Sequence, residues 1–455
     1  MTAKRFFLIG HPLGHSLSPE IHAAIMRASG VDGTYELLDT PPERVAETVR
    51  RLLRESDGFN ATIPHKKAVM PFLSGLSDAA RRCDAVNTVF RGRGYNTDTA
   101  GFASAGMPLR GASVLLLGTG GVSAMMAAES VAAGAESLCV ASRSEDSARA
   151  FAASLRERFP GARCGIRTVD SSDPERLRAA VRGATVLLNG TPVGMWPRAG
   201  GIPVPPDSLH DGLEVFDPVY CPTPTRLVLA AKKAGARAVG GLPMLVHQAV
   251  AAQKIWNPGL ALDAGAIAAA LVPALVADLW RKNPVKIVLT GFMGAGKSTV
   301  GRLLAARLGV EFADLDEEIV RSAGTPISKI FETSGEAGFR DAETETARRI
   351  LSEGPSAVVA SGGGFPTLAR NRELVRSCNA LVLNVDADFP TAWARIAGDG
   401  TRPLSRSREE TAALFAAREP VYRWFCDASV RTCAGKPASE VAGRAAALLC
   451  AETPA

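Results

Sequence analysis

The sequence GFMGAGKST, residues 291–299, joins a glycine-rich loop to a Lys and two hydroxyl side chains. Such loops bring backbone N–H groups close to phosphates, aim a helix N-terminus at them, and add an ammonium group and a Mg²⁺-binding hydroxyl. The apolar run 286–290 directly upstream predicts the strand that precedes a loop of this kind. The sequence therefore predicts a nucleotide triphosphate site in a domain that begins near Asn283.

Length and composition leave room for more than this one domain. The chain has 455 residues with 46% hydrophobic content, enough for several ordinary cores. About 280 residues precede the loop, so they require a second fold with its own chemistry. The formal charge of +6 is spread among acidic residues, which favours anionic small molecules as ligands and argues against nucleic acid.

The cysteines and the apolar segments indicate a soluble cytoplasmic protein. The eight Cys residues form no CxxC pair and no dense framework, so we interpret them as reduced thiols. The run Phe6–Ile9 is too short for a signal peptide. The Ala-rich segment between Asp263 and Asp278 contains Pro273, and we expect it to be too short to span a bilayer.

Apolar runs and helical patterns alternate along the chain, which predicts an α/β fold made of three units. We expect the first unit over residues 1–105, completed by helices over 240–280, and the second over 106–239. A linker over 281–284 then leads into the P-loop unit, residues 285–455, with a parallel sheet.

A glycine turn in the second unit indicates a dinucleotide site of the Rossmann type. The predicted strand 113–117 leads into GTGGVSA, residues 118–124, then a helix and a second strand, 137–141. Glycine turns after strands also occur for steric reasons alone. That second strand ends in Ser142-Arg143-Ser144, and an Arg between hydroxyls suits the 2′-phosphate of NADP better than the ribose of NAD.

Six separated clusters, in this order, resemble shikimate dehydrogenase over roughly residues 4–280: GHPLGHSLSPEIH, NATIPHK, AVNTV, NTDTAGF, VFDPVY and GGLPMLVHQA. The resemblance implies reduction of 3-dehydroshikimate to shikimate with NADP(H). It implies that the substrate carboxylate is held by Ser16, Ser18 and Tyr220, that the ring hydroxyls contact Thr62, Asn87 and Gln248, and that Lys66 and Asp98 form the catalytic pair.

The chemistry suits Lys66 and Asp98. Hydride transfer builds negative charge on the carbonyl oxygen, which an ammonium group stabilises and protonates, while a carboxylate orients the ammonium group. Taken alone, Lys66 is also typical of a solvated surface residue, Asp98 of a turn cap and Tyr220 of a core ring. The cofactor residues implied by the turn and the resemblance are Gly118, Thr119, Gly120, Gly121, Val122, Ser142, Arg143, Ser144, Asp78, Pro218 and Gly241.

One position departs from the family pattern. Relatives usually carry a second basic residue three positions after the Ser or Thr that follows the Arg, whereas this chain has Ser147 there, after Glu145 and Asp146. Arg143 is then the main cation for the 2′-phosphate unless Arg149 reaches back.

Downstream of the P-loop, five further clusters and the loop itself resemble shikimate kinase across about residues 285–450: FADLDEEI, GEAGFRDAE, SGGGF, RIAGDGTRPL and REPVY. The resemblance implies ATP-dependent phosphorylation of shikimate. Asp314 and Asp316 would serve Mg²⁺ and the acceptor, although two helix-capping acids would look the same. The implied substrate residues are Asp316 as the candidate base, Arg340 and Arg418 on the carboxylate with Glu343 assisting, and Gly362, Gly363 and Gly364 beside the ring.

Phosphoryl transfer needs charge neutralisation and positioning more than covalent catalysis. The resemblance implies that ATP is held by Gly294, Ala295, Gly296, Lys297, Ser298, Thr299, Arg395 and Arg402, with Pro403 also near adenine. Lys297 and the lid residue Arg402 would act on the transferred group, and Ser298 and Asp314 would hold Mg²⁺. Without the register of these motifs, Arg340 and Arg418 would be typical of surface ion pairs.

The two halves together predict a bifunctional enzyme of aromatic biosynthesis whose second half consumes the product of the first. Its partners are the small molecules 3-dehydroshikimate and shikimate. The alternatives are a quinate/shikimate dehydrogenase that uses NAD, fused to the kinase, and a metabolite-sensing regulatory protein built from these domains. The sequence does not determine the oligomeric state.

Overall fold

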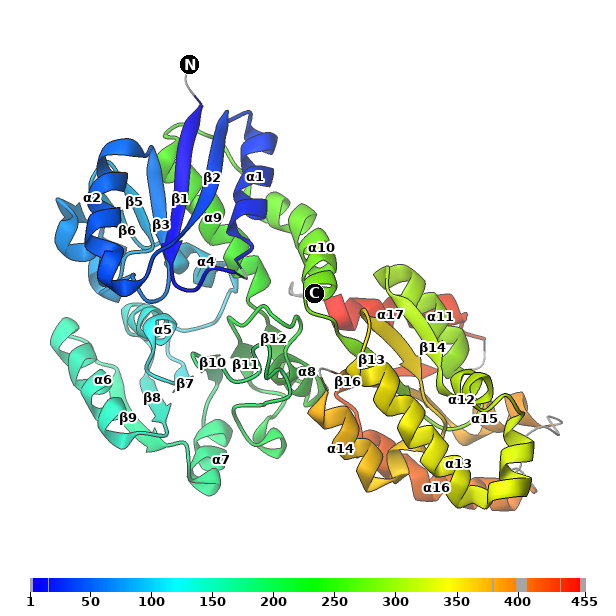
Figure 1. The fold of residues 1–455 in the computed structure, drawn as a ribbon. Coiled ribbons are helices and arrows are strands. Elements are labelled where there is room, and N and C mark those ends of the chain that lie inside the picture. Colours follow the sequence, from blue (N-terminus) through cyan, green and yellow to red (C-terminus); the bar gives the residue numbers. More distant parts are fainter. Residues whose placement is uncertain (1–2, 15, 379, 398–406, 434, 451–455) are drawn as a thin grey trace.

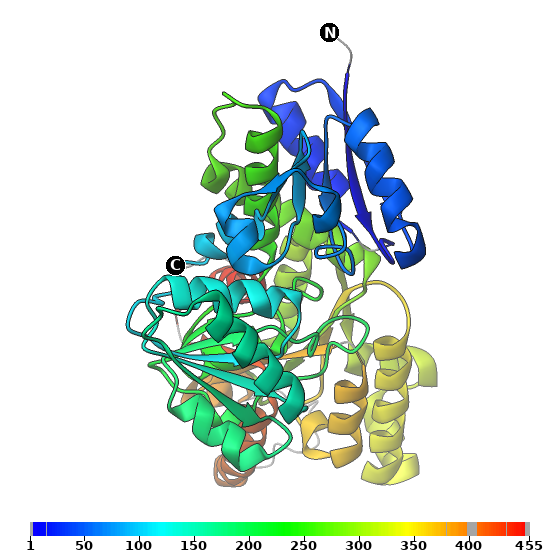
Figure 2. The same ribbon diagram turned by 90° about the vertical axis from the view of Figure 1, so that its left-hand side faces the viewer.

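A computed structural model describes the chain except for residues 1–2, 15, 379, 398–406, 434 and 451–455. The described residues build three separate sheets in chain order, each with its own helices (Figure 1). Seen from the side, the unit of the first sheet lies above the other two (Figure 2). The α/β architecture with three units that the sequence predicts is confirmed.

The first sheet is mixed, with strand order β2-β1-β3-β5-β6-β4. Its parallel core pairs β1 with β2 and β3, and β5 and β6 extend it antiparallel. The strands are β1 (Lys4–Gly10), β2 (Gly33–Asp39), β3 (Gly58–Ala61), β4 (Gly75–Leu76), β5 (Thr88–Phe90) and β6 (Arg93–Tyr95). The helices beside it are α1 (Ser18–Ser29), α2 (Val45–Glu55), α3 (Asp78–Cys83), α4 (Asp98–Ser104), α9 (Leu242–Trp256) and α10 (Ala264–Lys282).

The second sheet has the order β12-β11-β10-β7-β8-β9, and its strands are parallel. They are β7 (Ser113–Leu117), β8 (Ser137–Ser142), β9 (Gly165–Asp170), β10 (Val186–Asn189), β11 (Glu214–Phe216) and β12 (Arg237–Val239). Four helices connect them: α5 (Gly121–Ala132), α6 (Glu145–Arg158), α7 (Pro174–Arg182) and α8 (Arg226–Lys233). The predicted strand 113–117 is confirmed to the residue, and the strand predicted over 137–141 is one residue longer.

The third sheet is parallel with the order β14-β15-β13-β16-β17. Its strands are β13 (Lys286–Thr290), β14 (Glu311–Asp314), β15 (Ala357–Ala360), β16 (Ala380–Ala387) and β17 (Ala428–Thr432). Its helices are α11 (Lys297–Leu308), α12 (Leu315–Ala323), α13 (Ile327–Ser352), α14 (Ala369–Ser377), α15 (Phe389–Ile396), α16 (Arg408–Phe425) and α17 (Ala438–Cys450). Strand β13 stands where the sequence predicts it, directly before the P-loop.

One apolar cluster joins the first unit to the third. It contains Ile21 of α1, Val246 of α9, Leu279 of α10 and Ile287 of β13. Helix α10 continues through Pro273 to Lys282, so it is longer than the sequence led us to expect and takes in the first two residues of the expected linker. Among the described residues it is the one helix long and apolar enough to cross a bilayer, and its buried side chains belong to this cluster.

Candidate functional sites

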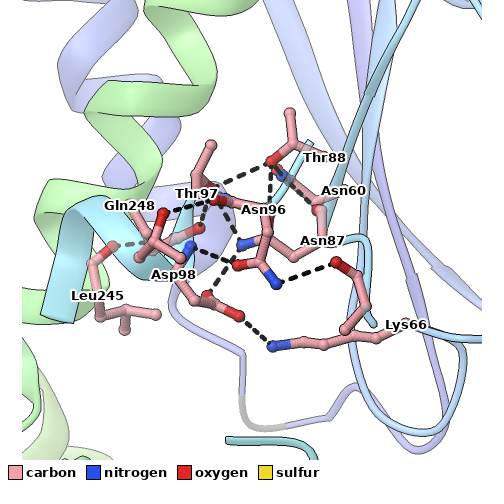
Figure 3. A network of polar contacts seen from close by, with 11 residues as sticks. Asn60, Lys66, Asn87, Thr88, Asn96, Thr97, Asp98, Leu245 and Gln248 are labelled. Carbon is pink, nitrogen blue, oxygen red and sulfur yellow. Dashed lines mark hydrogen bonds and ion pairs between the residues drawn. The ribbon is translucent and has the colours of Figure 1, made fainter. Parts of the chain in front are cut away.

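The predicted catalytic pair of the first unit is in direct contact. Lys66 lies in the turn after β3, and Asp98 is the first residue of α4. The Lys66 Nζ atom donates to the Asp98 Oδ2 atom at 2.5 Å, with side chains 22% and 13% exposed (Figure 3). An ion pair this shielded keeps one geometry better than a solvated pair. Lys66 is therefore not the solvated surface residue that its local sequence also allowed, and the Asp98 carboxylate contacts Lys66 and Asn87 instead of acting as a turn cap.

Asn87 holds the carboxylate of this pair. Its Nδ2 atom donates to Asp98 Oδ1 at 2.9 Å, and its Oδ1 atom accepts from the backbone N–H of Thr97 at 2.7 Å. The Thr97 hydroxyl donates to Gln248 Oε1 at 3.4 Å, and Gln248 Nε2 donates to the carbonyl of Leu245 (Figure 3). The structure therefore brings Lys66, Asn87, Asp98 and Gln248 into one buried polar network.

Two residues without a predicted role connect Ser18 to this network. The Tyr35 hydroxyl is hydrogen-bonded with Ser18 and donates to Asn60 Oδ1 at 2.8 Å. The Asn60 Nδ2 atom donates in turn to the carbonyl of Asn87 at 2.9 Å. Asn60 opens the NATIPHK cluster, so the motif contained the signal for it. Tyr35 stands on β2 outside every cluster and could not be found that way.

The remaining predicted substrate residues are Ser16 and Thr62 of the first unit and Tyr220 of the second. The Ser16 hydroxyl accepts from the N–H of Ser18 at 3.2 Å, at the start of α1. Thr62 lies at the end of β3, four residues before Lys66, and its N–H donates to Ile9. Tyr220 follows β11 in the second unit, and burial raises the pKa of its hydroxyl. No direct contact between Tyr220 and Lys66 occurs within the described part of the chain.

The glycine turn of the second unit follows β7 as predicted. Gly118 has a φ of +86°, and a Cβ atom there would lie 3.0 Å from the Thr191 methyl, so both the backbone and the space favour glycine. Thr119 and Gly120 complete the turn, and α5 begins at Gly121 with Val122 half-buried behind it. A turn made of three glycines and Thr119 at the start of a helix fits a pyrophosphate group.

The predicted 2′-phosphate site lies at the end of β8. The Ser142 hydroxyl accepts from the N–H of Ser144, and the Ser144 hydroxyl caps α6 by accepting from the N–H of Ser147 at 3.2 Å. Arg143 between them is exposed. Arg149 does not reach back, because it pairs with Glu145 at 2.5 Å and Asp146 at 3.6 Å.

The other predicted cofactor residues of the first half differ in their surroundings. A Cβ atom at Gly241 would lie 2.0 Å from the Pro218 carbonyl oxygen, so these two backbones are packed directly together. Asp78 begins α3, has an 81% exposed side chain and is ion-paired with Arg81. Asp78 thus has the local pairing that a simple helix-start residue would show.

The P-loop wraps around the ammonium group of Lys297. Lys297 is the first residue of α11, and its Nζ atom donates to the carbonyls of Gly291 at 2.9 Å and Phe292 at 3.0 Å. Gly294, Ala295, Gly296 and Thr299 complete the segment at this helix N-terminus. Arg395 donates to the carbonyls of Gly294 and Ala295, and Thr432, which the sequence did not single out, also donates to Ala295.

Asp314 caps a helix, one of the two roles that the sequence left open, and also contacts the predicted Mg²⁺ ligand Ser298. Its Oδ1 atom caps α12 by accepting from the N–H of Asp316 at 3.1 Å, and its Oδ2 atom accepts from the Ser298 hydroxyl at 2.6 Å. A hydroxyl and a carboxylate in contact beside a P-loop are the oxygen donors that Mg²⁺ prefers, so these residues fit that ion.

The SGGGF segment after β15 is surrounded by charged side chains. A Cβ atom at Gly364 would lie 2.4 Å from the Arg340 guanidinium, and one at Gly362 would lie 2.6 Å from Glu343 Oε1 and 3.6 Å from Asp316 Oδ1. A Cβ atom at Gly363 would lie 3.8 Å from the Arg418 guanidinium. The glycines therefore leave the space in which two cations and two carboxylates face the backbone.

Glu343 is the most buried charged group at this site. Its side chain is 0% exposed and pairs with Arg340 at 2.9 Å. Burial raises the pKa of Glu343, and the Arg340 cation opposes that rise. Its Oε1 atom has no hydrogen-bond partner among the described residues and lies next to Gly362. Arg340 is thus a buried cation, not the surface ion pair that its local sequence also allowed.

Arg418 and Tyr422 reach the same glycines from α16. Tyr422 is hydrogen-bonded with Arg418 and donates to the carbonyl of Gly363 at 2.5 Å. Burial raises the pKa of Tyr422 to about 12, so it remains a hydrogen-bond donor. Arg402 and Pro403, predicted for the lid and the adenine region, lie outside the described residues.

Three family models match successive parts of the chain. They are the shikimate dehydrogenase substrate binding domain at residues 8–89, the saccharopine dehydrogenase NADP binding domain at 114–193, and shikimate kinase at 293–449.

Curated relatives and solved structures resemble the first half. NADP(+) shikimate dehydrogenase from Rubrobacter xylanophilus is 40% identical over 276 residues, 58% of this chain and 94% of the relative. The Moorella thermoacetica enzyme of the same name is 36% identical, over 55% of this chain and 86% of the relative. The structure of shikimate 5-dehydrogenase from Thermus thermophilus with NADP(H) and shikimate is 34% identical, with a TM-score of 0.51 over 59% of this chain and 98% of that one.

Proposed function

The chain belongs to the shikimate dehydrogenase family and carries a shikimate kinase domain, and we propose that it catalyses two consecutive reactions of the shikimate pathway. The first is the NADPH-dependent reduction of 3-dehydroshikimate to shikimate, and the second is the ATP-dependent phosphorylation of shikimate on its 3-hydroxyl. One observation carries the proposal: a single chain contains both sites. One site has the shielded Lys66–Asp98 pair, and the other has a P-loop next to a group of four charged side chains, Asp316, Glu343, Arg340 and Arg418.

We propose a division of labour that follows the three sheets. Residues 1–105, with the helices of 240–280, would bind 3-dehydroshikimate, residues 106–239 would bind NADPH, and residues 285–455 would form the kinase, joined by the linker 281–284. The matches to the substrate binding, NADP binding and kinase families fall inside these ranges and support this division.

In the first reaction, bound NADPH supplies the hydride. Lys66 would stabilise the negative charge that develops on the carbonyl oxygen and donate a proton to it. Asp98 would hold the ammonium group in place and accept a hydrogen bond from a substrate hydroxyl, and Asn87 would fix that carboxylate through its 2.9 Å contact. We assign the ring hydroxyls to Asn87, Gln248 and Thr62, and the carboxylate to Ser16, Ser18 and Tyr220.

Preference for NADPH over NADH would depend mainly on Arg143. We propose that it pairs with the 2′-phosphate while Ser142 and Ser144 donate to the same group. Arg149 is committed to Glu145 and Asp146, so it leaves Arg143 without a second cation. The glycine turn at 118–121 would hold the pyrophosphate, with Val122, Asp78, Pro218 and Gly241 as further cofactor residues.

In the second reaction, this half must position shikimate against the terminal phosphate of ATP. Arg340 and Arg418 would pair with the carboxylate, and Gly362–Gly364 would bring the backbone up to the ring. Asp316 would accept the proton of the 3-hydroxyl, and Glu343 would assist by holding Arg340. Lys297, Arg395 and Arg402 would bind and neutralise the nucleotide, with Gly294, Ala295, Gly296 and Thr299 lining its phosphates. A bound Mg²⁺, held by Ser298 and Asp314, would neutralise phosphate charge.

Two alternatives make different predictions. An NAD-dependent quinate/shikimate dehydrogenase would use NADH at least as well as NADPH. A metabolite sensor would bind shikimate and nucleotides without turnover. The presence of all six predicted catalytic and nucleotide-binding residues in the sequence argues against it: Lys66, Asp98, Lys297, Ser298, Asp316 and Arg402. We also propose a cytoplasmic location with small-molecule partners only, in keeping with relatives that are biosynthetic enzymes.

Steady-state rates of the two half-reactions on the whole chain test the proposal. The first assay follows NADPH oxidation with 3-dehydroshikimate, and the second follows ADP release with shikimate, ATP and Mg²⁺. We expect both activities and a higher specificity constant for NADPH than for NADH. A preparation that binds both substrates without turning over either would favour the sensor.

A further inference from the structure

Arg226, the first residue of α8, is a buried cation at the boundary between the second unit and the kinase domain. Only 8% of the residue is exposed. Its guanidinium donates to the carbonyl of Gly200 at 3.1 Å and to the carbonyl of Ala380, at the start of β16, at 2.7 Å. It also lies 3.7 Å from Asp427, directly before β17. One side chain thus joins a loop of the second unit to the start of β16 and to the residue before the edge strand β17 of the kinase sheet.

The kinase side of this contact is buried as well. The Asp427 side chain is 16% exposed, and its Oδ2 atom accepts from the N–H of Val382 at 2.7 Å. Burial raises the pKa of Asp427, and the Arg226 cation opposes that rise. A guanidinium has a rigid planar set of donors, so acceptors in three different segments fix the orientation of the two domains as well as their attachment.

Further contacts lie beside Arg226. Lys233, the last residue of α8, donates to the carbonyls of Arg423 and Cys426, at the C-terminal end of α16. The indole N–H of Trp280 donates to the carbonyl of Thr223, and the Ser356 hydroxyl donates to the carbonyl of Trp280. Figure 1 shows α8 at the side of the second unit that faces β16 and α14.

The loop that Arg226 contacts at Gly200 lies, at its other end, beside the dinucleotide turn. Residues 190–201 follow β10, and the Gly190 carbonyl accepts from the Ser123 hydroxyl of α5 at 3.3 Å. Thr191 packs on Gly118, whose added Cβ atom would lie 3.0 Å from the Thr191 methyl. In the middle of the loop, the N–H of Trp196 donates to the carbonyl of Cys221 at 2.8 Å, next to Tyr220.

The base of this loop is tied to the start of α8 by a buried carboxylate. Asp217, at the end of β11, accepts from Asn189 at 2.9 Å and from the Thr225 hydroxyl at 2.7 Å. Asn189 is the residue before the loop, and Thr225 is the N-cap of α8. Both ends of the loop are therefore fixed close to Arg226, one through Asp217 and the other through Gly200.

We propose that Arg226 is a positioning residue for the dehydrogenase site and that the kinase domain, through Ala380 and Asp427, is the support against which it holds the loop 190–201. The loop borders both the dinucleotide turn and the Tyr220 segment, so its position affects binding of the cofactor and of the substrate carboxylate. This inference rests on the proposed dehydrogenase function. The dehydrogenase relatives correspond to 55–61% of this chain, so the support is a property of the fused chain.

The test compares full-length R226A and R226K with K233A. Lys233 contacts the kinase domain from the same helix, and among the described residues its side-chain hydrogen bonds go to Arg423 and Cys426 and not to the loop, so K233A is the matched control. In R226A we expect the KM values for NADPH and 3-dehydroshikimate to rise about threefold to tenfold, with kcat and the kinase KM for shikimate changed less than about twofold. R226K keeps the positive charge but loses the planar set of donors of the guanidinium, so its KM values should lie between those of R226A and the wild type.

A second readout does not depend on turnover. Hydrogen exchange of the loop amides, Trp196 included, should be faster in R226A than in the wild type and unchanged in K233A. Because R226A leaves Asp427 buried without its cation, the double variant R226A/D427N serves if R226A does not fold, and it should show the same faster exchange.

Unchanged loop exchange and unchanged KM values in a folded R226A, or equal effects in K233A, would overturn the inference. A lower melting temperature without change in either readout would make Arg226 merely structural and would also overturn it. If the wild type itself lacks dehydrogenase activity, the proposed function fails, whereas the exchange experiment still decides whether Arg226 holds the loop.

Discussion

The side chains of Lys66 and Asp98, 32 residues apart in sequence, meet at 2.5 Å between Nζ and Oδ2 in the polar network of the first unit. The neighbouring Lys67 instead pairs with Asp84 at 2.6 Å, with a 65% exposed side chain. K66A should therefore lower kcat for reduction of 3-dehydroshikimate by about 10²–10⁴-fold, the range for loss of a positioned acid. The matched variant K67A should keep reductase activity within about twofold, because exposed ion pairs contribute little. Equal losses in both variants would contradict the assignment.

Lys297 provides the corresponding test in the kinase half. K297A removes the cation inside the P-loop and should abolish phosphorylation of shikimate while reductase rates stay unchanged, as measured by the two separate half-reaction assays. Arg302 lies on the same helix, pairs with Glu317 and is 54% exposed, so R302A is the control that should retain kinase activity. A K297A protein with kinase activity near that of the wild type would refute the nucleotide assignment.

The contact between Gly364 and Arg340 predicts a steric route to lost shikimate binding. A Cβ atom at Gly364 would lie 2.4 Å from the guanidinium, so G364A must displace Arg340. We expect the kinase KM for shikimate to rise about tenfold to a hundredfold, as for loss of a charge-assisted hydrogen bond, with the KM for ATP little changed. Two other glycines are not suitable as controls for G364A. Gly354 has open space around it apart from the Lys286 side chain at 3.9 Å, but its φ of +75° favours glycine, and Gly443 lies far along the chain on α17.

A simpler control for that variant is R348A, because Arg348 lies on the same helix as Arg340 and makes an exposed ion pair with Glu345. R348A should leave both KM values within about twofold of the wild type. Unchanged shikimate KM in G364A, determined by initial rates at saturating ATP, would mean that Arg340 does not bind the substrate.

Arg143 and Ser147 predict the direction of cofactor preference. R143A should lower the ratio of kcat/KM for NADPH to that for NADH, because it removes the main cation for the 2′-phosphate. S147R should raise that ratio by adding a second cation where relatives carry one. R149A should change the ratio less than R143A, because Arg149 is paired with Glu145 and Asp146. A larger effect in R149A than in R143A would reverse the assignment.

Burial of His22 predicts a pH dependence of stability. Burial lowers the pKa of His22 from 6.5 to about 3, its Nδ1 atom is hydrogen-bonded with Gln253 at 3.0 Å, and the unfolded chain binds the proton first. Stability should therefore be lost as pH falls below 6.5, by up to about 1.4 kcal/mol per pH unit. The difference in unfolding free energy between wild type and H22L, from urea titrations at pH 7, 6 and 5, should shrink as pH falls. A constant difference would contradict the burial argument.

The motifs predicted the fold class and the contacts between neighbouring residues well, because each motif corresponds to a defined local arrangement of strand, turn and helix. A strand, a glycine turn and a helix in series predict strand β7 and the start of α5 directly, and the P-loop does the same for β13 and α11. The sequence left Asp314 open between capping and cation binding because both roles need the same carboxylate at the same place. The structure shows the cap and a contact with the Ser298 hydroxyl, and cation binding stays a prediction.

Long-range contacts outside the recognised motifs could not be predicted from the sequence. Tyr35 reaches Asn60 only because β1 lies between β2 and β3 in the first sheet, and no local pattern encodes that strand order. Likewise, the local sequence around Arg226 indicates only an ordinary residue at the start of a helix. Its contacts with Ala380 and Asp427 depend on how α8 packs against the kinase sheet. The resemblance to shikimate kinase implied an assisting role for Glu343, and its contact with Arg340, three residues away on one helix, is a local relationship.

The central claim is that one chain makes shikimate and then phosphorylates it. The most direct measurement incubates the purified full-length protein with 3-dehydroshikimate, NADPH, ATP and Mg²⁺ and follows the products by mass spectrometry. We predict that the wild type converts 3-dehydroshikimate to shikimate 3-phosphate and consumes one NADPH and one ATP per molecule. K66A should form no shikimate, whereas K297A should form shikimate and accumulate it. Failure of the wild-type protein to form either shikimate or its phosphate would contradict the account.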